Sequence, residues 1–262
     1  MTDPTPYAHV NKLLDELLAG IQRVLGDKLA GLYLYGSLVT GSYDDGISDV
    51  DLLAALASDL NDAEFDALHQ MQTEIVSQNP AWDDRIEIAY LSLHGLQTYK
   101  TERSALGIIS PGEPFHMIDA GIDWLMNWYV VRTQGKTLFG PPPETIIAPV
   151  SRQEYIDAVM AYIKTTPSWF DHAHHRSFQS YAILTMCRGL YASKYGEQVS
   201  KAQAAAWAQQ ELPEWSTLIE NALHWRKALK DTDVDHEATL PETRRFIHDV
   251  LERLAQSATR TG

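Results

Sequence analysis

The segment Leu34–Leu53 constrains the fold more than any other part of the chain, and it reads LYGSLVTGSYDDGISDVDLL. Two short apolar runs, residues 30–35 and 49–57, flank a glycine-containing loop here. Short apolar runs of this kind are typical of buried β-strands, and the first contains aromatic residues and stops at Gly36, whereas the second carries charges only at its start. The pattern therefore predicts two strands joined by a loop that begins at Gly36.

The polar residues of this segment suit a phosphate and a cation. Gly36 lets the backbone turn sharply and approach a phosphate closely, and the Ser37 hydroxyl can donate to a phosphate oxygen. Asp49 and Asp51 stand two residues apart on an extended chain, so both carboxylates project from one face. Their mutual repulsion is relieved by a cation, and oxygen ligands suit Mg²⁺. A DxD pair alone would also fit a solvated strand end, so the assignment depends on its neighbours.

A third carboxylate comes from a further predicted strand. Residues 85–91, RIEIAYL, alternate between apolar and other side chains, which places Glu87 on the less apolar face. Three acidic groups that converge from adjacent strands beside a phosphate-binding loop would form a site for metal-assisted phosphoryl or nucleotidyl transfer.

Helical periodicity surrounds these strands and fills the second half of the chain. It predicts one helix over 10–25 and another from about 63 to 75, capped by Asn61 or Asp62. Further helices are predicted over residues 155–163, 181–195, 202–212, 215–229 and 243–254. The proline-rich residues 140–143 are the best candidate for a linker. We expect an α+β domain with a mixed sheet, residues 1–150, followed by an all-helical domain, residues 151–262.

Composition limits the partners. The chain has 21 Lys and Arg against 35 Asp and Glu, hence a net charge of −14, which disfavours nucleic acid and suits a cationic small molecule. Cys187 is the only cysteine, so neither a disulfide framework nor a cysteine-held zinc is expected. The start of the chain does not resemble a signal peptide, and no apolar stretch reaches the roughly 18 residues of a membrane span. We expect a soluble, cytoplasmic protein without membrane partners.

The motifs resemble a known family. The Gly36-Ser37 pair followed by SDxDLL is similar to the signature of the polymerase-β-like nucleotidyltransferase superfamily. Residues 180–208, SYAILTMCRGLYASKYGEQVSKAQAAAWA, resemble the C-terminal helical domain of the aminoglycoside adenylyltransferases that modify streptomycin and spectinomycin. The resemblance covers essentially the whole chain. It implies ATP-dependent transfer of AMP to a hydroxyl of an aminoglycoside or aminocyclitol, with release of pyrophosphate.

The resemblance also implies roles for the acidic residues. Asp49 and Asp51 match magnesium ligands that hold two ions, and Glu87 matches the glutamate that acts as catalytic base beside the metal. In this family the helical domain closes over nucleotide and acceptor, and we expect the same of residues 151–262, in a monomer.

Nucleotide-binding residues are implied on both halves of the chain. Gly36, Ser37 and Ser48 match residues near the triphosphate. Arg188 and Lys201 match basic residues that reach the ATP phosphates, where they would stabilise the leaving pyrophosphate.

The resemblance also implies an acceptor site. Trp169 and Asp171 would contact the acceptor, and Trp128 would form a second aromatic wall of the site. Some family residues are replaced: a histidine by Tyr181, and a tyrosine near the ATP base by Lys227. Asp171 is the only carboxylate in 170–178, where streptomycin-modifying members place several.

Two other functions fit the same sequence. One is nucleotidyl transfer to a different acceptor, a protein hydroxyl or another metabolite. The other is a nucleotide-binding regulator without turnover, which would not need a base such as Glu87. The histidine-rich residues 172–175 fit a polar loop better than a metal site, because no carboxylate or cysteine partners stand at fixed spacing.

Overall fold

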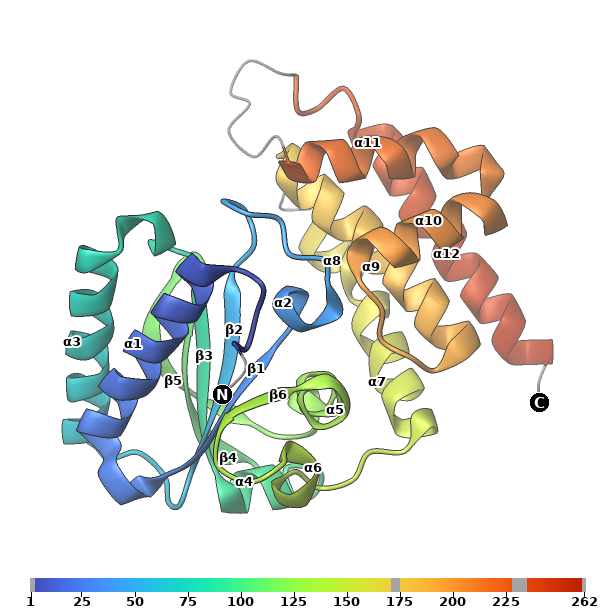
Figure 1. Ribbon diagram of the computed structural model, residues 1–262. Coiled ribbons are helices and arrows are strands. Elements are labelled where there is room, and N and C mark those ends of the chain that lie inside the picture. Colours follow the sequence, from blue (N-terminus) through green and yellow to red (C-terminus); the bar gives the residue numbers. More distant parts are fainter. Residues whose placement is uncertain (1–2, 171–174, 228–234, 261–262) are drawn as a thin grey trace. The chain divides into compact units, whose positions relative to one another are not determined.

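A computed structural model describes residues 3–170, 175–227 and 235–260, with side chains up to residue 256 (Figure 1). The chain divides into two compact units, Met1–Val150 and Ser151–Gly262. The first unit is built on a sheet, and the second consists of helices.

The first unit contains a six-stranded sheet in the order β5-β4-β3-β2-β1-β6. Its strands are β1 (Leu29–Tyr35), β2 (Val50–Leu56), β3 (Ile86–Ser92), β4 (Ser104–Ser110), β5 (Glu113–Ala120) and β6 (Lys136–Phe139). Strands β2 and β3 run parallel, and the other neighbours are antiparallel. The mixed sheet of the predicted α+β fold is thereby confirmed.

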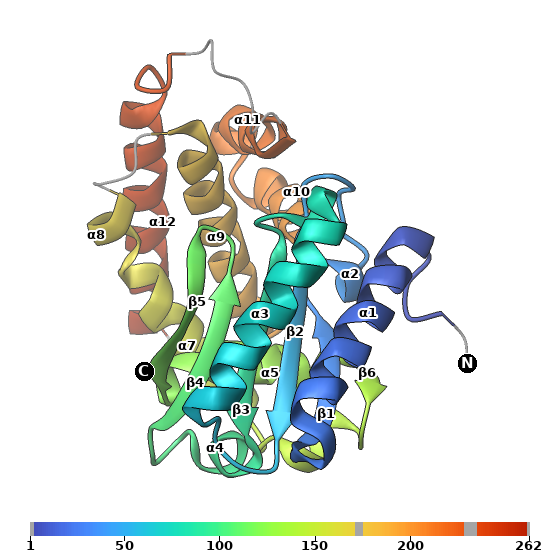
Figure 2. The ribbon, with the colours of Figure 1, turned by 90° about the vertical axis from the view of Figure 1, so that its left-hand side faces the viewer.

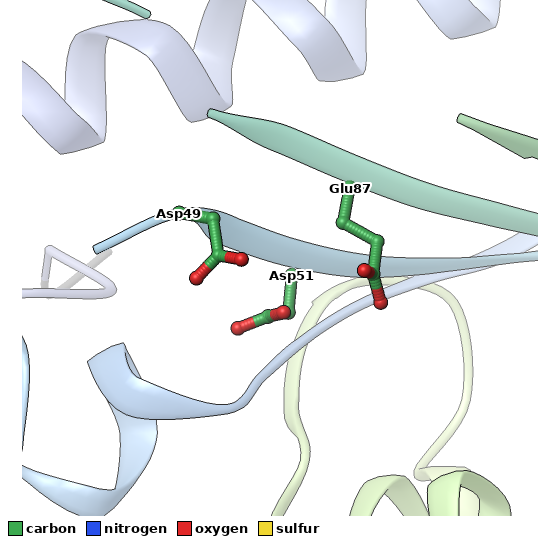
Figure 3. A group of neighbouring side chains, drawn as sticks. All are labelled: Asp49, Asp51 and Glu87. Carbon is green, nitrogen blue, oxygen red and sulfur yellow. The ribbon is translucent and has the colours of Figure 1, made fainter. Parts of the chain in front are cut away.

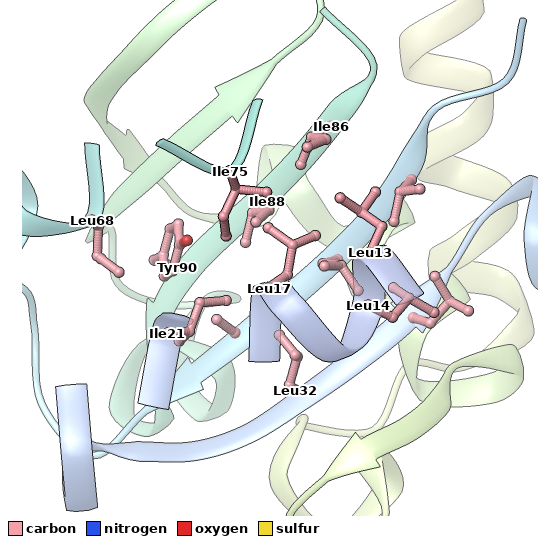
Figure 4. Packing of buried hydrophobic residues seen from close by; sticks show 14 of the residues in the cluster. Leu13, Leu14, Leu17, Ile21, Leu32, Leu68, Ile75, Ile86, Ile88 and Tyr90 are labelled. Carbon is pink, nitrogen blue, oxygen red and sulfur yellow. The ribbon is translucent and has the colours of Figure 1, made fainter. Parts of the chain in front are cut away.

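Helices α1 (Ala8–Leu25) and α3 (Asp62–Gln78) cover one face of this sheet (Figure 2). The apolar side of α1, with Leu17 and Ile21, packs on Leu32 of β1 and Ile88 of β3 in a fully buried cluster (Figure 4). Burial of each such side chain contributes about 1.5–3 kcal/mol to folding. Since successive strand residues point to opposite faces, the residues between these apolar ones point to the other face of the sheet.

Strand register decides which residues meet on that other face. Asp51 of β2 pairs with Glu87 of β3 in the parallel ladder, and with Tyr35 of β1 in the antiparallel ladder. The three residues therefore form a row across the three central strands.

The remaining elements of the first unit are short or lie at its edges. They are α2 (Ser37–Thr40), α4 (Leu93–Thr98), α5 (Leu125–Gln134), α6 (Pro143–Ile146) and the 3₁₀ turns Gly26–Lys28, Pro80–Trp82 and Ile122–Trp124. Residues 140–143 are not the linker that the prolines suggest. The Tyr33 hydroxyl donates to the Pro141 carbonyl at 2.8 Å, and the Ala148 amide donates to the Leu96 carbonyl at 3.0 Å. The chain thus stays bonded to the first unit through residue 148.

The second unit is a bundle around α9 (Arg176–Tyr195), which packs against α7 (Arg152–Lys164), α10 (Lys201–Glu211), α11 (Ser216–Lys227) and α12 (Leu240–Arg260). A short helix, α8 (Thr166–Phe170), and the turn Pro213–Trp215 complete it. Serines at positions 151 and 200 begin α7 and α10 with capping boxes, which satisfy backbone amides that a helix start leaves open. No helix in the described ranges is long and apolar enough to cross a membrane.

Candidate active site

An acidic triad lies at one end of the central strands. Asp49 immediately precedes β2, Asp51 is its second residue, and Glu87 is the second residue of β3. The three side chains are half-buried, and each offers one carboxylate oxygen within 4.8 Å of the others (Figure 3). The parallel register of β2 and β3 brings the predicted carboxylates together on one face.

The surroundings of Glu87 disfavour the ionised form of its carboxyl group. Burial raises the pKa of its carboxyl group above the usual value, and the Asp49 charge raises that pKa further, while a hydrogen bond from Tyr35 lowers it. Like charges this close are stabilised by a cation. Three carboxylates at one point are a donor set that fits Mg²⁺.

Gly36 is required where β1 ends. Its φ is +72°, a backbone conformation that residues other than glycine rarely adopt. A β-carbon at this position would also overlap the Asp51 carboxylate. The next residue, Ser37, has a buried hydroxyl for which the described residues provide no hydrogen-bond partner. A buried polar group normally has a partner, so this hydroxyl is suited to bind an oxygen of a ligand.

Ser48 lies in a tightly bonded loop before Asp49. Its hydroxyl accepts from the Asp44 amide at 3.0 Å, and its carbonyl accepts from Arg85 Nη2 at 2.6 Å and Nε at 3.1 Å. The Arg85 guanidinium also lies 4.5 Å from the centre of the Trp82 ring. Arg85 thereby fixes the backbone that carries Asp49, a role that the sequence analysis missed.

Tyr35 is a second residue that the sequence analysis missed. It lies at the end of β1, is almost fully buried, and donates its hydroxyl to Glu87 Oε1 at 3.1 Å. Burial and the neighbouring charges of Glu87, Asp51 and Asp49 raise the pKa of this hydroxyl well above its ordinary value, so it stays protonated as a donor.

Two of the predicted site residues of the second unit, Lys201 and Trp169, lie beside Tyr181. The Lys201 ammonium lies 5.3 Å from the centre of the Tyr181 ring, and the Trp169 ring lies 5.6 Å from it. The Tyr181 hydroxyl is 2.8 Å from that of Tyr162. Nε of Arg188 and Nε1 of Trp169 are buried and have no partner among the described residues. This side of the bundle therefore combines cations with unsatisfied donors.

Of the two other predicted acceptor residues, the structure describes only Trp128. Trp128 of α5 is completely buried in the first unit, where it stacks on Trp124 at 5.3 Å between ring centres. Asp171 lies outside the described residues, as do His172 and His174.

Comparisons with known proteins agree with this picture. Residues 14–103 match the nucleotidyltransferase domain, and residues 145–253 match the C-terminal domain of aminoglycoside adenylyltransferase. Aminoglycoside (3'') (9) adenylyltransferases of Shigella flexneri and Escherichia coli are each 28% identical over 225 residues, which cover 79% of this chain and 80% of the relative. The fold is similar to that of spectinomycin adenyltransferase from Enterococcus faecialis, crystallised with ATP and spectinomycin. That likeness has a TM-score of 0.71 at 18% identity and covers 93% of this chain and 98% of the other.

The acidic triad in a matching catalytic domain defines the class of protein: this chain is a nucleotidyltransferase. The helical second unit shows which nucleotidyltransferases the chain resembles, because it matches the C-terminal domain of aminoglycoside adenylyltransferase. Over most of its length the chain is similar to aminoglycoside adenylyltransferases. The family resemblance and the enzyme class predicted from the sequence are confirmed.

Proposed function

We propose that the protein transfers AMP from ATP to a hydroxyl of an aminoglycoside or aminocyclitol antibiotic, and releases pyrophosphate. The observation that carries this proposal is the convergence of Asp49, Asp51 and Glu87 in a nucleotidyltransferase domain joined to the adenylyltransferase C-terminal domain. Streptomycin and spectinomycin are the first acceptors to test, because the similar proteins are named for aminoglycosides and spectinomycin.

Glu87 takes the proton in the proposed reaction. The acceptor oxygen attacks the α-phosphorus of ATP, its proton passes to the Glu87 carboxylate, and the bond to pyrophosphate breaks. Burial raises the pKa of Glu87, which makes the carboxylate a better base than a solvated one. Asp49, Asp51 and Glu87 would hold Mg²⁺, two ions in the form that the resemblance implies. Bound there, the metal supplies charge neutralisation to the triphosphate.

The nucleotide is bound by residues of both units in this proposal. Gly36, Ser37 and Ser48 receive the triphosphate beside the triad, and Arg188 and Lys201 bind phosphate oxygens when the helical unit closes over the nucleotide. The Ser37 hydroxyl and Arg188 Nε, which have no hydrogen-bond partner among the described residues, are available for such bonds.

The acceptor is a polycation, and Trp169, Asp171 and Trp128 are its proposed contacts. Of these, Trp169 has the strongest support, because its ring lies beside Tyr181 and its indole nitrogen has no partner among the described residues, whereas Trp128, whose indole nitrogen also has none there, is completely buried. The net charge of −14 would favour the approach of such a molecule.

The test is to incubate the protein with MgATP and streptomycin, spectinomycin or a panel of other aminoglycosides. We expect pyrophosphate release and a drug product heavier by one AMP group. Glu87→Gln should remove turnover and retain MgATP binding, whereas an unchanged rate would remove Glu87 from the base role. If MgATP binds and no drug gains AMP, the acceptor is another molecule or the protein is a regulator, and the proposal fails.

A further inference from the structure

We propose that Tyr35 is a positioning residue for the reaction: its hydroxyl holds Glu87 in the orientation in which the carboxylate accepts the proton of the acceptor. This inference rests on the proposed role of Glu87 as base. It concerns a residue that neither the motif pattern nor the family resemblance singled out.

The strand order makes the contact possible. Tyr35, Asp51 and Glu87 form one cross-strand row on β1, β2 and β3. Neighbouring strands lie about 4.8 Å apart, so the backbones of Tyr35 and Glu87 are separated by about 10 Å. A tyrosine side chain is long enough to pass over the middle strand, and its hydroxyl lies 3.1 Å from Glu87 Oε1. Phenylalanine would fill the same space without reaching the carboxylate.

The bond restrains a carboxylate that its surroundings would otherwise displace. Asp49 and Asp51 lie within 4.8 Å of Glu87 and repel it. In the described part of the chain, Tyr35 makes the one hydrogen bond to the Glu87 side chain. Tyr35 is only 6% exposed, so packing fixes the donor itself. With Oε1 engaged by this donor, Oε2 remains for the proton of the acceptor.

Tyr33 provides a matched control for the loss of a buried tyrosine hydroxyl. It stands two residues earlier on β1, so it points to the same face of the sheet. It is fully buried, and its hydroxyl donates to the Pro141 carbonyl at 2.8 Å, away from the triad. A purely structural contribution of Tyr35 should therefore resemble that of Tyr33.

The first experiment compares Tyr35→Phe with Tyr33→Phe in steady-state kinetics, using the acceptor found in the drug panel. We expect Tyr35→Phe to lower kcat by about tenfold or more and to leave the KM for MgATP within about twofold. Tyr33→Phe should keep kcat within about twofold, and thermal unfolding should show that both variants fold. An unchanged kcat in Tyr35→Phe would overturn the proposal, as would equal losses in the two variants.

A second experiment does not depend on turnover. In metal-free protein carrying isotope-labelled glutamate carboxyls, the NMR resonance of Glu87 is identified by its absence from Glu87→Gln. Tyr35→Phe should shift this resonance and Tyr33→Phe should leave it in place, so an unmoved resonance in Tyr35→Phe contradicts the positioning role by itself. If the resonance shifts while Glu87→Gln remains fully active, the failure lies in the proposed base. If Glu87→Gln is inactive while Tyr35→Phe keeps full activity, the failure lies in the inference about Tyr35.

Discussion

The backbone of Gly36 lies directly against the carboxylate of Asp51. A β-carbon added at position 36 would come within 2.7 Å of Asp51 Cγ and closer still to Oδ2. The same glycine turns the chain out of β1 with a φ of +72°. One residue thus ends the strand and leaves room for a carboxylate of the triad.

Gly36→Ala should displace Asp51 and remove adenylyl transfer. The added methyl group cannot avoid the carboxylate, and the backbone conformation of Gly36, with φ +72° and ψ −143°, costs a residue other than glycine about 1–3 kcal/mol of folding stability in addition. Gly41→Ala is the control, because Gly41 has a φ of +71° but nothing within 4 Å of its added β-carbon. We expect both variants to lose thermal stability and only Gly36→Ala to lose Mn²⁺ binding in a titration. Equal Mn²⁺ affinities would contradict this explanation.

Asp51→Asn should separate stability from activity. Without metal, the carboxylates of the triad repel one another, so removal of one charge should leave the melting temperature in EDTA unchanged or higher. Magnesium should stabilise the wild-type protein by binding the folded state, and this gain should vanish in the variant, with activity lowered about a hundredfold or more. Asp66→Asn, an exposed change on α3, should keep both the Mg²⁺ effect and the activity. A full Mg²⁺-induced rise of melting temperature in Asp51→Asn would exclude Asp51 as a ligand.

The central strands could be predicted from the sequence because their periodicity is strong. β1 and β2 are apolar runs with one interruption, and β3 alternates with Glu87 as its one charged residue. By contrast, β4, β5 and β6 were missed. β5 is an edge strand with a proline and several exposed residues, and β6 has only four residues, so neither shows a buried pattern.

The sequence pattern also predicts only some of the residues of the candidate active site. The spacing of Asp49 and Asp51 predicts that they share a face, and the alternation of β3 places Glu87. Tyr35 could not be recognised, because a tyrosine at a strand end suggests core packing and its partner is two strands away. Only the order β3-β2-β1 reveals that its hydroxyl reaches Glu87. Most helices were predicted with starts that were too late, as for α9, because polar residues such as Arg176 and Ser177 in the first turn hide the period. The helix predicted from residue 215 instead begins one residue later, at Ser216 of α11.

Glu64 should make stability depend on pH in the acidic range. Burial raises the pKa of Glu64, but hydrogen bonds from Lys28 and from the Asn61 amide lower it below the ordinary value overall. The ion pair is therefore stabilising above the ordinary glutamate pKa of about 4.3 and is lost as pH falls through the lower, folded-state pKa. Glu64→Gln should cost about 0.5–1 kcal/mol in urea unfolding near pH 7, and this difference should disappear once the pH falls below the folded-state pKa of Glu64.

Glu74→Gln is the control for this titration. Glu74 is exposed on the same helix and bonds to Gln70 at 2.9 Å rather than to a cation. Its replacement should have only a small effect on stability near pH 7, because it removes no ion pair with a lysine. A loss in Glu64→Gln that persists at low pH would assign the effect to packing instead of charge.

Lys201 and Lys194 offer a direct test of phosphate binding by the helical unit. Each ammonium lies 5.3 Å from an aromatic ring, that of Lys201 over Tyr181 and that of Lys194 over Trp207. Lys194 also pairs with Glu211 at 3.0 Å. Replacement of either by alanine should cost at most about 1 kcal/mol of stability, since both interactions are near the surface.

Their effects on catalysis should differ. If Lys201 binds a phosphate of ATP, Lys201→Ala should raise the KM for MgATP by about tenfold and lower kcat, because the leaving pyrophosphate loses a cation. Lys194→Ala should leave both constants within about twofold. Steady-state kinetics with MgATP as the varied substrate decides the matter. Equal, small effects of the two replacements would mean that Lys201 contributes to the fold of α10 and not to the nucleotide site.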